Sequence, residues 1–279
     1  MDMEQVSEKV LRIVEEIAKR TATEHYRLVL NEEREAKITG SKVGGMPYWP
    51  ANKDFPVDGG GNKMLLLMQI NCEEAGLKAP LPEQGMLQWF ISVNPERMYG
   101  CQGNYNEDGT GVRIVYHETI EENALPTNAP THDTVDPMLT PVKREVAIDV
   151  VAEPTSMGVN DGHFNRLFAD IVKDITGDDM GDKAWYAYLN NDECLLLEQQ
   201  GMKRPHHQML GYPVYTQDEA RRDIEYHDTL LFQLDSQFST QGQGELVMWG
   251  DMGSGFIFIH HDDLAALDFT HIYYCWDCG

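Results

Sequence analysis

The chain has few cysteines and lacks a long apolar run. Its five cysteines are an odd number without the regular spacing of a disulfide framework, which predicts free thiols in a reducing compartment. The strongly apolar run at 64–68 is far too short to cross a bilayer. No apolar stretch near the N-terminus has the pattern of a secretory signal. These absences predict a cytoplasmic protein that is not embedded in a membrane.

Basic residues are also scarce. The sequence has 22 Lys and Arg against 46 Asp and Glu, which gives a net charge of −24. A surface this acidic repels phosphate backbones, so nucleic-acid binding is not expected. The same charge favours a basic protein partner, although it also serves solubility alone. Composition does not determine the oligomeric state.

Signatures of catalysis and of metal binding are missing. There is no Gly-x-Ser-x-Gly elbow, and Gly59-Gly-Gly61 lacks the Lys-Ser/Thr that completes a phosphate loop. Cys275 and Cys278 form a single Cys-x-x-Cys pair, whereas a structural zinc site normally needs four ligands. The adjacent histidines at 206–207 and 260–261 would point to opposite faces if they lie on strands. We therefore expect no metal and no cofactor.

Against these absences stands a repeated pattern. Three blocks recur in order, at offsets of 166, 164 and 168 residues: Gly45-Met-Pro47 and Gly211-Tyr-Pro213, Gln69 and Gln233, and Gly85 and Gly253. Loop insertions between two copies of one unit would produce such small differences in offset, although two similar apolar hairpins could also arise by chance. The pattern predicts one domain over residues 1–279, with repeated halves at about 41–98 and 206–277.

Hydrophobic periodicity predicts the secondary structure. Strands are expected at residues 25–31, 64–71, 85–93, 111–118, 144–153, 229–235, 256–259 and 272–276. Helices are expected at 4–20, 161–175 with Asp161 as the cap, 216–226 and 260–267, with one helical turn at 94–98. Residues 121–141, rich in Pro, Thr and Asn, read as a long excursion. The expected fold class is α+β, with mainly antiparallel sheets, an internally duplicated strand unit and a few peripheral helices.

Several short motifs occur in a family-like order: Gly44-Gly-Met-Pro47, His207-x-x-Leu-Gly-Tyr-Pro213, Gln233-Leu-Asp235, Trp249-Gly-Asp-Met-Gly253, Phe256-Ile-Phe-Ile259 and Asp263-Leu264. In these motifs the chain resembles the YwqG-like bacterial family of unknown function, over roughly residues 38–277. The resemblance implies a mostly antiparallel α+β protein with a repeated sheet unit, and it implies no activity. Some such proteins are thought to lie near secreted-toxin systems, an association that would suit an acidic inhibitor.

Two functions remain open. The first is a protein-interaction module, for example an acidic inhibitor of a basic protein such as a toxin. The alternative is a hydrolase or small-molecule-binding enzyme with a pocket between the two repeats. The candidate pocket residues are Lys42, Gln69, His207, Gln233, Asp235, Trp249 and Asp251. Asp235 and Asp251 are either an acid/base pair or acceptors for backbone amides in tight turns. A cleft into which these side chains converge would favour the enzyme.

Overall fold

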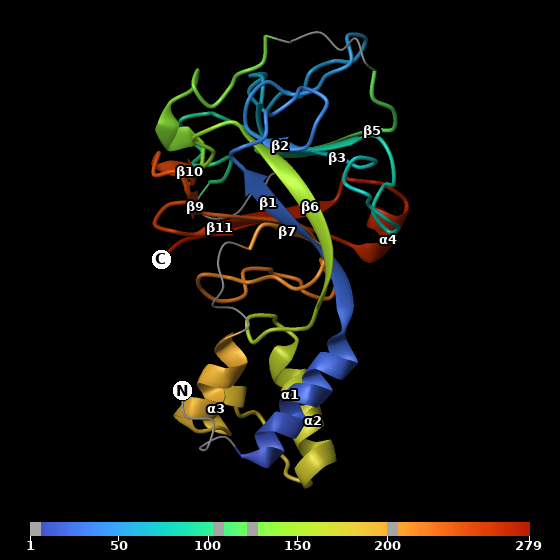
Figure 1. The fold of residues 1–279 in the computed structure, drawn as a ribbon, viewed down its shortest axis with the longest axis vertical. Coiled ribbons are helices and arrows are strands. Elements are labelled where there is room, and N and C mark those ends of the chain that lie inside the picture. Colours follow the sequence, from blue (N-terminus) through green and yellow to red (C-terminus); the bar gives the residue numbers. More distant parts are fainter. Residues whose placement is uncertain (1–6, 103–108, 122–127, 200–205) are drawn as a thin grey trace.

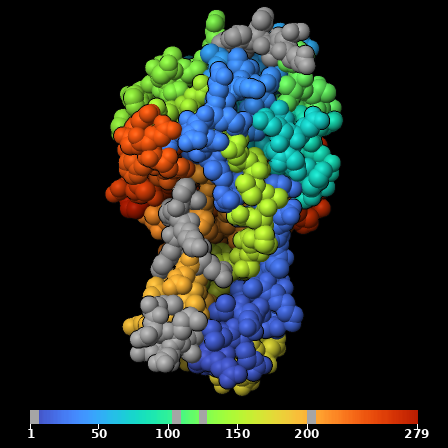
Figure 2. All heavy atoms as spheres, viewed as in Figure 1, coloured from blue at the N-terminus to red at the C-terminus, as the bar shows by residue number. Residues whose placement is uncertain are grey.

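The computed structural model describes residues 7–102, 109–121, 128–199 and 206–279, and its fold is α+β (Figure 1). A large sheet occupies one end of the elongated molecule, and three helices occupy the other. The space-filling view shows a narrower waist between these two parts (Figure 2). The helices are α1 (Glu8–Thr21), α2 (Phe164–Thr176), α3 (Asn191–Glu198) and α4 (His261–Ala265), with 3-10 turns at Pro137–Leu139 and Trp185–Ala187.

Ten strands form the large sheet, in the order β12-β11-β8-β7-β1-β6-β2-β3-β4-β5, and all neighbours are antiparallel. Their bounds are β1 (Thr23–Asn31), β2 (Lys42–Val43), β3 (Leu65–Asn71), β4 (Met86–Ile91), β5 (Val112–His117), β6 (Val146–Thr155), β7 (Gln208–Met209), β8 (Thr229–Asp235), β11 (Ser254–Ile259) and β12 (Ile272–Asp277). A separate hairpin pairs β9 (Gln237–Phe238) with β10 (Glu245–Val247).

The strand order is the same on both sides of the central β1–β6 pair. Outward from β6 come β2, β3, β4 and β5, and outward from β1 come β7, β8, β11 and β12. The first strand of each wing, β2 or β7, has only two residues and leads into one of the two Gly-x-Pro segments. Each wing then adds three longer strands in chain order, which places β5 and β12 at the two ends of the sheet.

The sheet curls until its two wings meet. Trp89 of β4 stacks on Phe232 of β8 with ring centroids 6.1 Å apart, and on Trp249 at 6.0 Å. Near the two ends of the sheet, Tyr116 of β5 contacts Phe269 with ring centroids 6.1 Å apart. Because the apolar runs of β3 and β4 are covered on both faces, these strands are fully buried apart from Asn71. The result is a nearly closed sheet with a gap beside β5.

The three helices pack around a second core at the far end of the molecule. α1 buries Val10, Ile13 and Ile17 in one cluster with Phe168 and Ile171 of α2. These residues recur at helical spacing, so each helix presents one apolar face. None of the helices in the described residues is long and apolar enough to cross a membrane.

The structure confirms most of the predicted elements. The predicted helix at 4–20 is α1, although residues 4–6 lie outside the described part, and the predicted strands correspond to β1, β3, β4, β5, β6, β8, β11 and β12. The excursion at 121–141 is described only in part, because residues 122–127 are outside the described ranges. Residues 94–98 form a turn and not a helix, with the Arg97 amide donating to the Asn94 carbonyl.

Two further predictions about helices are wrong. Residues 216–226 are irregular, because the Asp277 carboxylate accepts the Thr216 amide at 2.6 Å and the buried Arg221 guanidinium turns toward Asp161. These tertiary contacts outweigh local helix propensity. Asp161 is not the N-cap of α2, because the helix begins at Phe164 and His163 holds that position; the Asp161 carboxylate accepts the His163 amide at 2.9 Å and lies 3.4 Å from Arg221.

Candidate functional site

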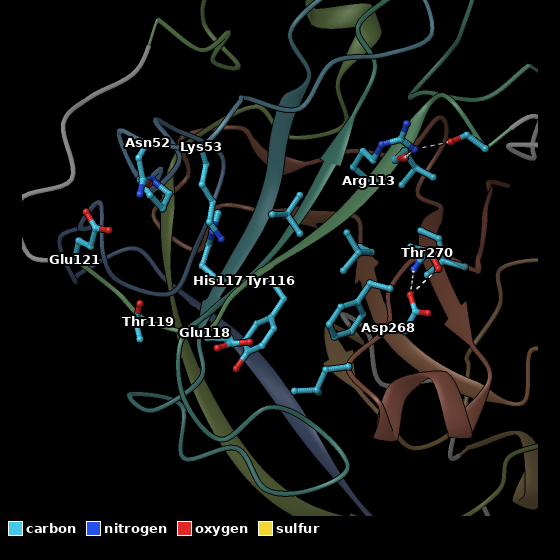
Figure 3. A pocket seen from close by; sticks show the side chains of 18 residues that line it. Asn52, Lys53, Arg113, Tyr116, His117, Glu118, Thr119, Glu121, Asp268 and Thr270 are labelled. Carbon is cyan, nitrogen blue, oxygen red and sulfur yellow. Dashed lines mark hydrogen bonds between the residues drawn. The ribbon is translucent and has the colours of Figure 1, made fainter.

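A cavity of about 980 Å³ lies beside β5 (Figure 3). All eight residues from 112 to 119 line it. The loop that carries Asn52 and Lys53 forms another part of the lining, and residues 267–270 with Ile272 form the side nearest β12. The cavity therefore occupies the gap of the nearly closed sheet, between the last strand of one wing and the approach to the last strand of the other.

One backbone edge of β5 runs along this cavity and has no strand partner among the described residues. Among the described strands β5 pairs only with β4, in a register without irregularity, and the Ser92 amide just beyond β4 donates to the Gly111 carbonyl at 2.8 Å. Hydrogen-bonded and non-hydrogen-bonded pairs alternate in an antiparallel ladder. The residues that bond to β4 are therefore 113, 115 and 117, while the amides and carbonyls of Val112, Ile114 and Tyr116 point toward the cavity side.

At one end of the cavity lie Lys53 and His117. The Lys53 ammonium is 3.4 Å from His117 Nδ1 and can only donate, so Nδ1 accepts and Nε2 carries the proton. The imidazole is buried edge-on to Trp49, with ring centroids 4.8 Å apart. Burial, followed by the nearby Lys53 charge, lowers the His117 pKa to about 4. His117 is therefore neutral near pH 7, and its Nε2 has no hydrogen-bond partner within the described residues.

The charged side chains of the lining carry both signs. Glu118, Glu121 and Asp268 are acidic, whereas Lys53 and Arg113 are basic. The Thr270 hydroxyl donates to Asp268 at 2.6 Å, which lowers the Asp268 pKa. Three carboxylates against two cations give this lining a small acidic excess on a strongly acidic protein.

Two of the residues predicted for a pocket hold the backbone instead. Gln69 and Gln233 are fully buried, one on each wing. Gln69 Oε1 accepts the Tyr48 amide at 3.0 Å, and its Nε2 donates to the Gly40 carbonyl at 2.8 Å. Gln233 Oε1 accepts the Val214 amide at 3.1 Å, and its Nε2 donates to the Val214 carbonyl at 2.9 Å.

His207 and Asp235 are neighbours of Gln233 on β7 and β8. The Asp235 amide donates to His207 Nδ1 at 3.0 Å, and the Asp235 carboxylate accepts the His206 amide at 2.7 Å and Gln233 Nε2 at 3.1 Å. Burial lowers the His207 pKa, which keeps this imidazole neutral. His207 also lines a second cavity of about 710 Å³, which adjoins β1 and the end of β6. The structure thus brings three of the seven residues together.

The remaining three predicted residues lie apart from that group. Lys42 is fully buried, and its ammonium donates to the Met46 carbonyl and to Glu145 Oε1, each at 2.6 Å. Burial lowers the Lys42 pKa, and Glu145 opposes that shift. Trp249 belongs to the aromatic core, whereas Asp251 is exposed on the turn that follows it. All seven are outside the lining of the cavity beside β5.

Sequence reasoning missed the residues that line this cavity. The alternation in 111–118 predicted a strand, and the structure places that strand, β5, at the end of the sheet. Strand order was the missing information. Only the order shows that one edge of β5 has no described strand beside it, and that residues 267–270 and Ile272 lie across the cavity from it.

The second histidine pair lies at the start of α4, the helix predicted at 260–267. His260 caps α4 and His261 begins it, so their ring centroids are only 4.2 Å apart. Single ligand atoms of Asp228, His260 and His261 lie within 4.8 Å of one another, as do those of Asp263, Asp268 and His271. His261 Nδ1 already contacts Asp228 Oδ2 at 2.5 Å, which raises the His261 pKa. The first group is thus organised as a surface ion pair.

Comparison with known proteins identifies a family whose description names no activity. The model of a family described as a domain of unknown function (DUF1963) matches residues 41–278. None of the curated proteins compared with the chain matches it. The matched residues include β2 to β12, and thus both cavities in large part, and they leave out α1 and β1.

Proposed function

The chain belongs to the family described as a domain of unknown function (DUF1963), and we propose that it is a protein-interaction module that binds a segment of a basic protein in the cavity beside β5. The observation that carries the proposal is the outer backbone edge of β5, which pairs with none of the other described strands and faces this cavity along its length. An unpaired edge is a template for another chain, and proteins normally cover it.

The charge of the protein supports a basic partner. At −24 it creates a field that steers positively charged proteins toward it and repels acidic ones. Glu118 and Glu121 are exposed beside the cavity and place two carboxylates at one end of it. An inhibitor of a basic protein such as a toxin would use charge in this way. Five free thiols are consistent with a reducing, cytoplasmic site of action.

We propose two finer assignments as well. The motifs that resemble the YwqG-like bacterial family lie within the matched residues 41–278, which supports that narrower relationship. The equal strand order of the two wings supports an internal duplication. So does the same use of Gln69 and Gln233, which accept the amide that follows each Gly-x-Pro segment.

Selection from a phage-displayed library of linear random peptides of about twelve residues tests the proposal. The protein is compared with a Glu118→Lys/Glu121→Lys variant and with a matched control, Glu15→Lys/Asp170→Lys, in exposed residues of α1 and α2 at the far end of the molecule. We expect basic peptides that bind the double variant about tenfold more weakly and bind the control as well as the parent. Enrichment of no peptide, or equal loss in both variants, would overturn the proposal.

A small-molecule-binding enzyme is the second candidate, and the size of the cavity favours it. A volume of about 980 Å³ is within the range of ligand pockets, and the Lys53 ammonium offers a point charge for a carboxylate or phosphate group. Thermal-shift screening against carboxylates and phosphates, with Lys53→Met as the comparison, tests it. A stabilising compound whose effect disappears in Lys53→Met would support this candidate, and the absence of any shift would reject it.

A further inference from the structure

We infer that the partner segment binds as an added β-strand, hydrogen-bonded to the free edge of β5 through alternate residues. This inference rests on the proposed function and specifies how the partner is held. The occupant is an extended, basic polypeptide segment of another protein, with apolar side chains at every second position.

The shape of the site favours an extended chain over a compact ligand. Eight consecutive residues, 112–119, line the cavity. The six of them that form β5, 112–117, extend for about 17 Å at the rise of a β-strand. The cavity follows this strand from end to end, so it can hold an extended peptide of about six residues that lies alongside β5. A compact small molecule would contact only part of it.

The backbone of β5 is prepared for such pairing. The ladder between β4 and β5 has no bulge, whereas the β3–β4 and β8–β11 ladders each contain one irregularity. A regular strand presents its free amides and carbonyls at regular intervals, as strand addition requires. Val112, Ile114 and Tyr116 supply these groups. The Val112 carbonyl already accepts a hydrogen bond of 3.2 Å from the Arg113 guanidinium. On binding, the Arg113 side chain either moves aside, or it stays and the new pairing ends before Val112.

The side chains around the gap define the chemistry of the segment. Ile114, Tyr116 and Phe269 form an apolar group on the face directed toward the main core. Side chains of an added strand alternate between the two faces, so every second residue would meet this group. Glu118 and Glu121 near one end of the cavity, together with the net negative charge of the protein, favour Lys or Arg at the alternate positions of the segment, whose side chains face away from the apolar group.

Backbone methylation of the selected peptide tests this mode of binding. One peptide from the phage selection is synthesised with a single N-methyl group at each position in turn, and its affinity is measured by calorimetry. An N-methyl group removes one donor and leaves the side chain in place. We expect losses with a period of two, about tenfold (about 1.4 kcal/mol) at alternate positions and little between them, because each methyl group at a bonded position removes one hydrogen bond.

Other outcomes separate this inference from the proposed function. If peptides bind, and lose affinity to Glu118→Lys/Glu121→Lys, but tolerate methylation everywhere or lose affinity without a period, strand addition is wrong and the interaction module stands. A contiguous block of sensitive positions would instead indicate a helical or irregular segment. If no peptide binds the protein at all, the proposed function fails and the mode of binding fails with it.

Discussion

Gln69 of β3 and Gln233 of β8 make equivalent hydrogen bonds to the backbone on opposite wings of the sheet. Each is fully buried, and each accepts the backbone amide of the residue that follows a Gly-x-Pro segment, Tyr48 at 3.0 Å and Val214 at 3.1 Å. The side-chain amides also donate to carbonyls, so both ends of each glutamine are used. The two loops are thereby fixed to the strands that they precede.

Replacement of either glutamine by leucine should destabilise the protein. Leucine has a similar volume but leaves buried backbone groups without partners, at a cost of about 1–3 kcal/mol for each unsatisfied group. We expect Gln69→Leu and Gln233→Leu each to lower the free energy of unfolding by about 2–4 kcal/mol in urea titrations. Gln243→Leu, at an exposed position, is the matched control and should change it by less than about 0.5 kcal/mol. Equal stability of all three variants would show that these bonds contribute nothing.

Acid should destabilise the protein in part through His117. Its pKa is about 4 in the folded protein against an ordinary 6.5. Between these values the unfolded chain binds a proton that the folded protein does not. The free energy of unfolding therefore falls as pH decreases through this window. By pH 4 the loss of stability caused by His117 is on the order of 3 kcal/mol.

The comparison with His117→Phe isolates this contribution. Phenylalanine keeps a ring beside Trp49 and cannot bind a proton. Urea titrations from pH 7 to pH 4 should show the wild-type protein losing stability more steeply than the variant. Parallel curves for the two proteins would mean that His117 titrates normally in the folded state.

Glycine is required where two backbones meet at the start of β11. A Cβ atom placed on Gly253 would lie 1.7 Å from the Asp277 carbonyl oxygen of β12, which only movement of the backbone could relieve. We expect Gly253→Ala to lower the free energy of unfolding by several kcal/mol, because two adjacent strands must separate. Gly158→Ala is the control, since none of the described atoms lies within 4 Å of the position that its Cβ would take. A stable Gly253→Ala protein would contradict this close approach.

Asp235 and Asp251, the two aspartates of the possible acid/base pair, have different surroundings. Asp235 is fully buried and accepts the His206 amide and the Gln233 side-chain amide, whereas Asp251 is exposed. Asp235→Ala should therefore cost about 2–4 kcal/mol, and Asp251→Ala less than about 0.5 kcal/mol, in thermal or urea unfolding. A similar, small effect of both changes would show that the Asp235 carboxylate does not stabilise the fold, and Asp235 would again be a candidate for acid/base chemistry.

Much of the fold follows from local sequence patterns. The apolar run at 64–71 and the alternation at 112–117 predict strands because burial on two faces or on one face leaves a direct mark on the residues. The helix expected at 216–226 fails for the opposite reason: Asp277, far along the chain, takes the amides of Thr216 and Gln217. Such contacts depend on the tertiary fold and leave no local pattern.

The candidate site was less predictable than the fold. Gln69 and Gln233 attract attention because they are polar residues within apolar strands, and the structure gives them backbone partners. Lys53, His117 and Phe269 are far apart in sequence, and they meet only because the sheet curls toward closure. Their proximity required the strand order and the curvature of the sheet, neither of which a single sequence displays.

Amide-resolved hydrogen exchange of β5 in the free protein tests the open edge most directly. The amides of Val115 and His117 face β4, whereas those of Ile114 and Tyr116 face the cavity. We predict that the second pair exchanges about a hundredfold faster than the first and becomes protected when a selected basic peptide is added. Equal protection of all four amides in the free protein would show that this edge is already covered, and would contradict its use as a binding site.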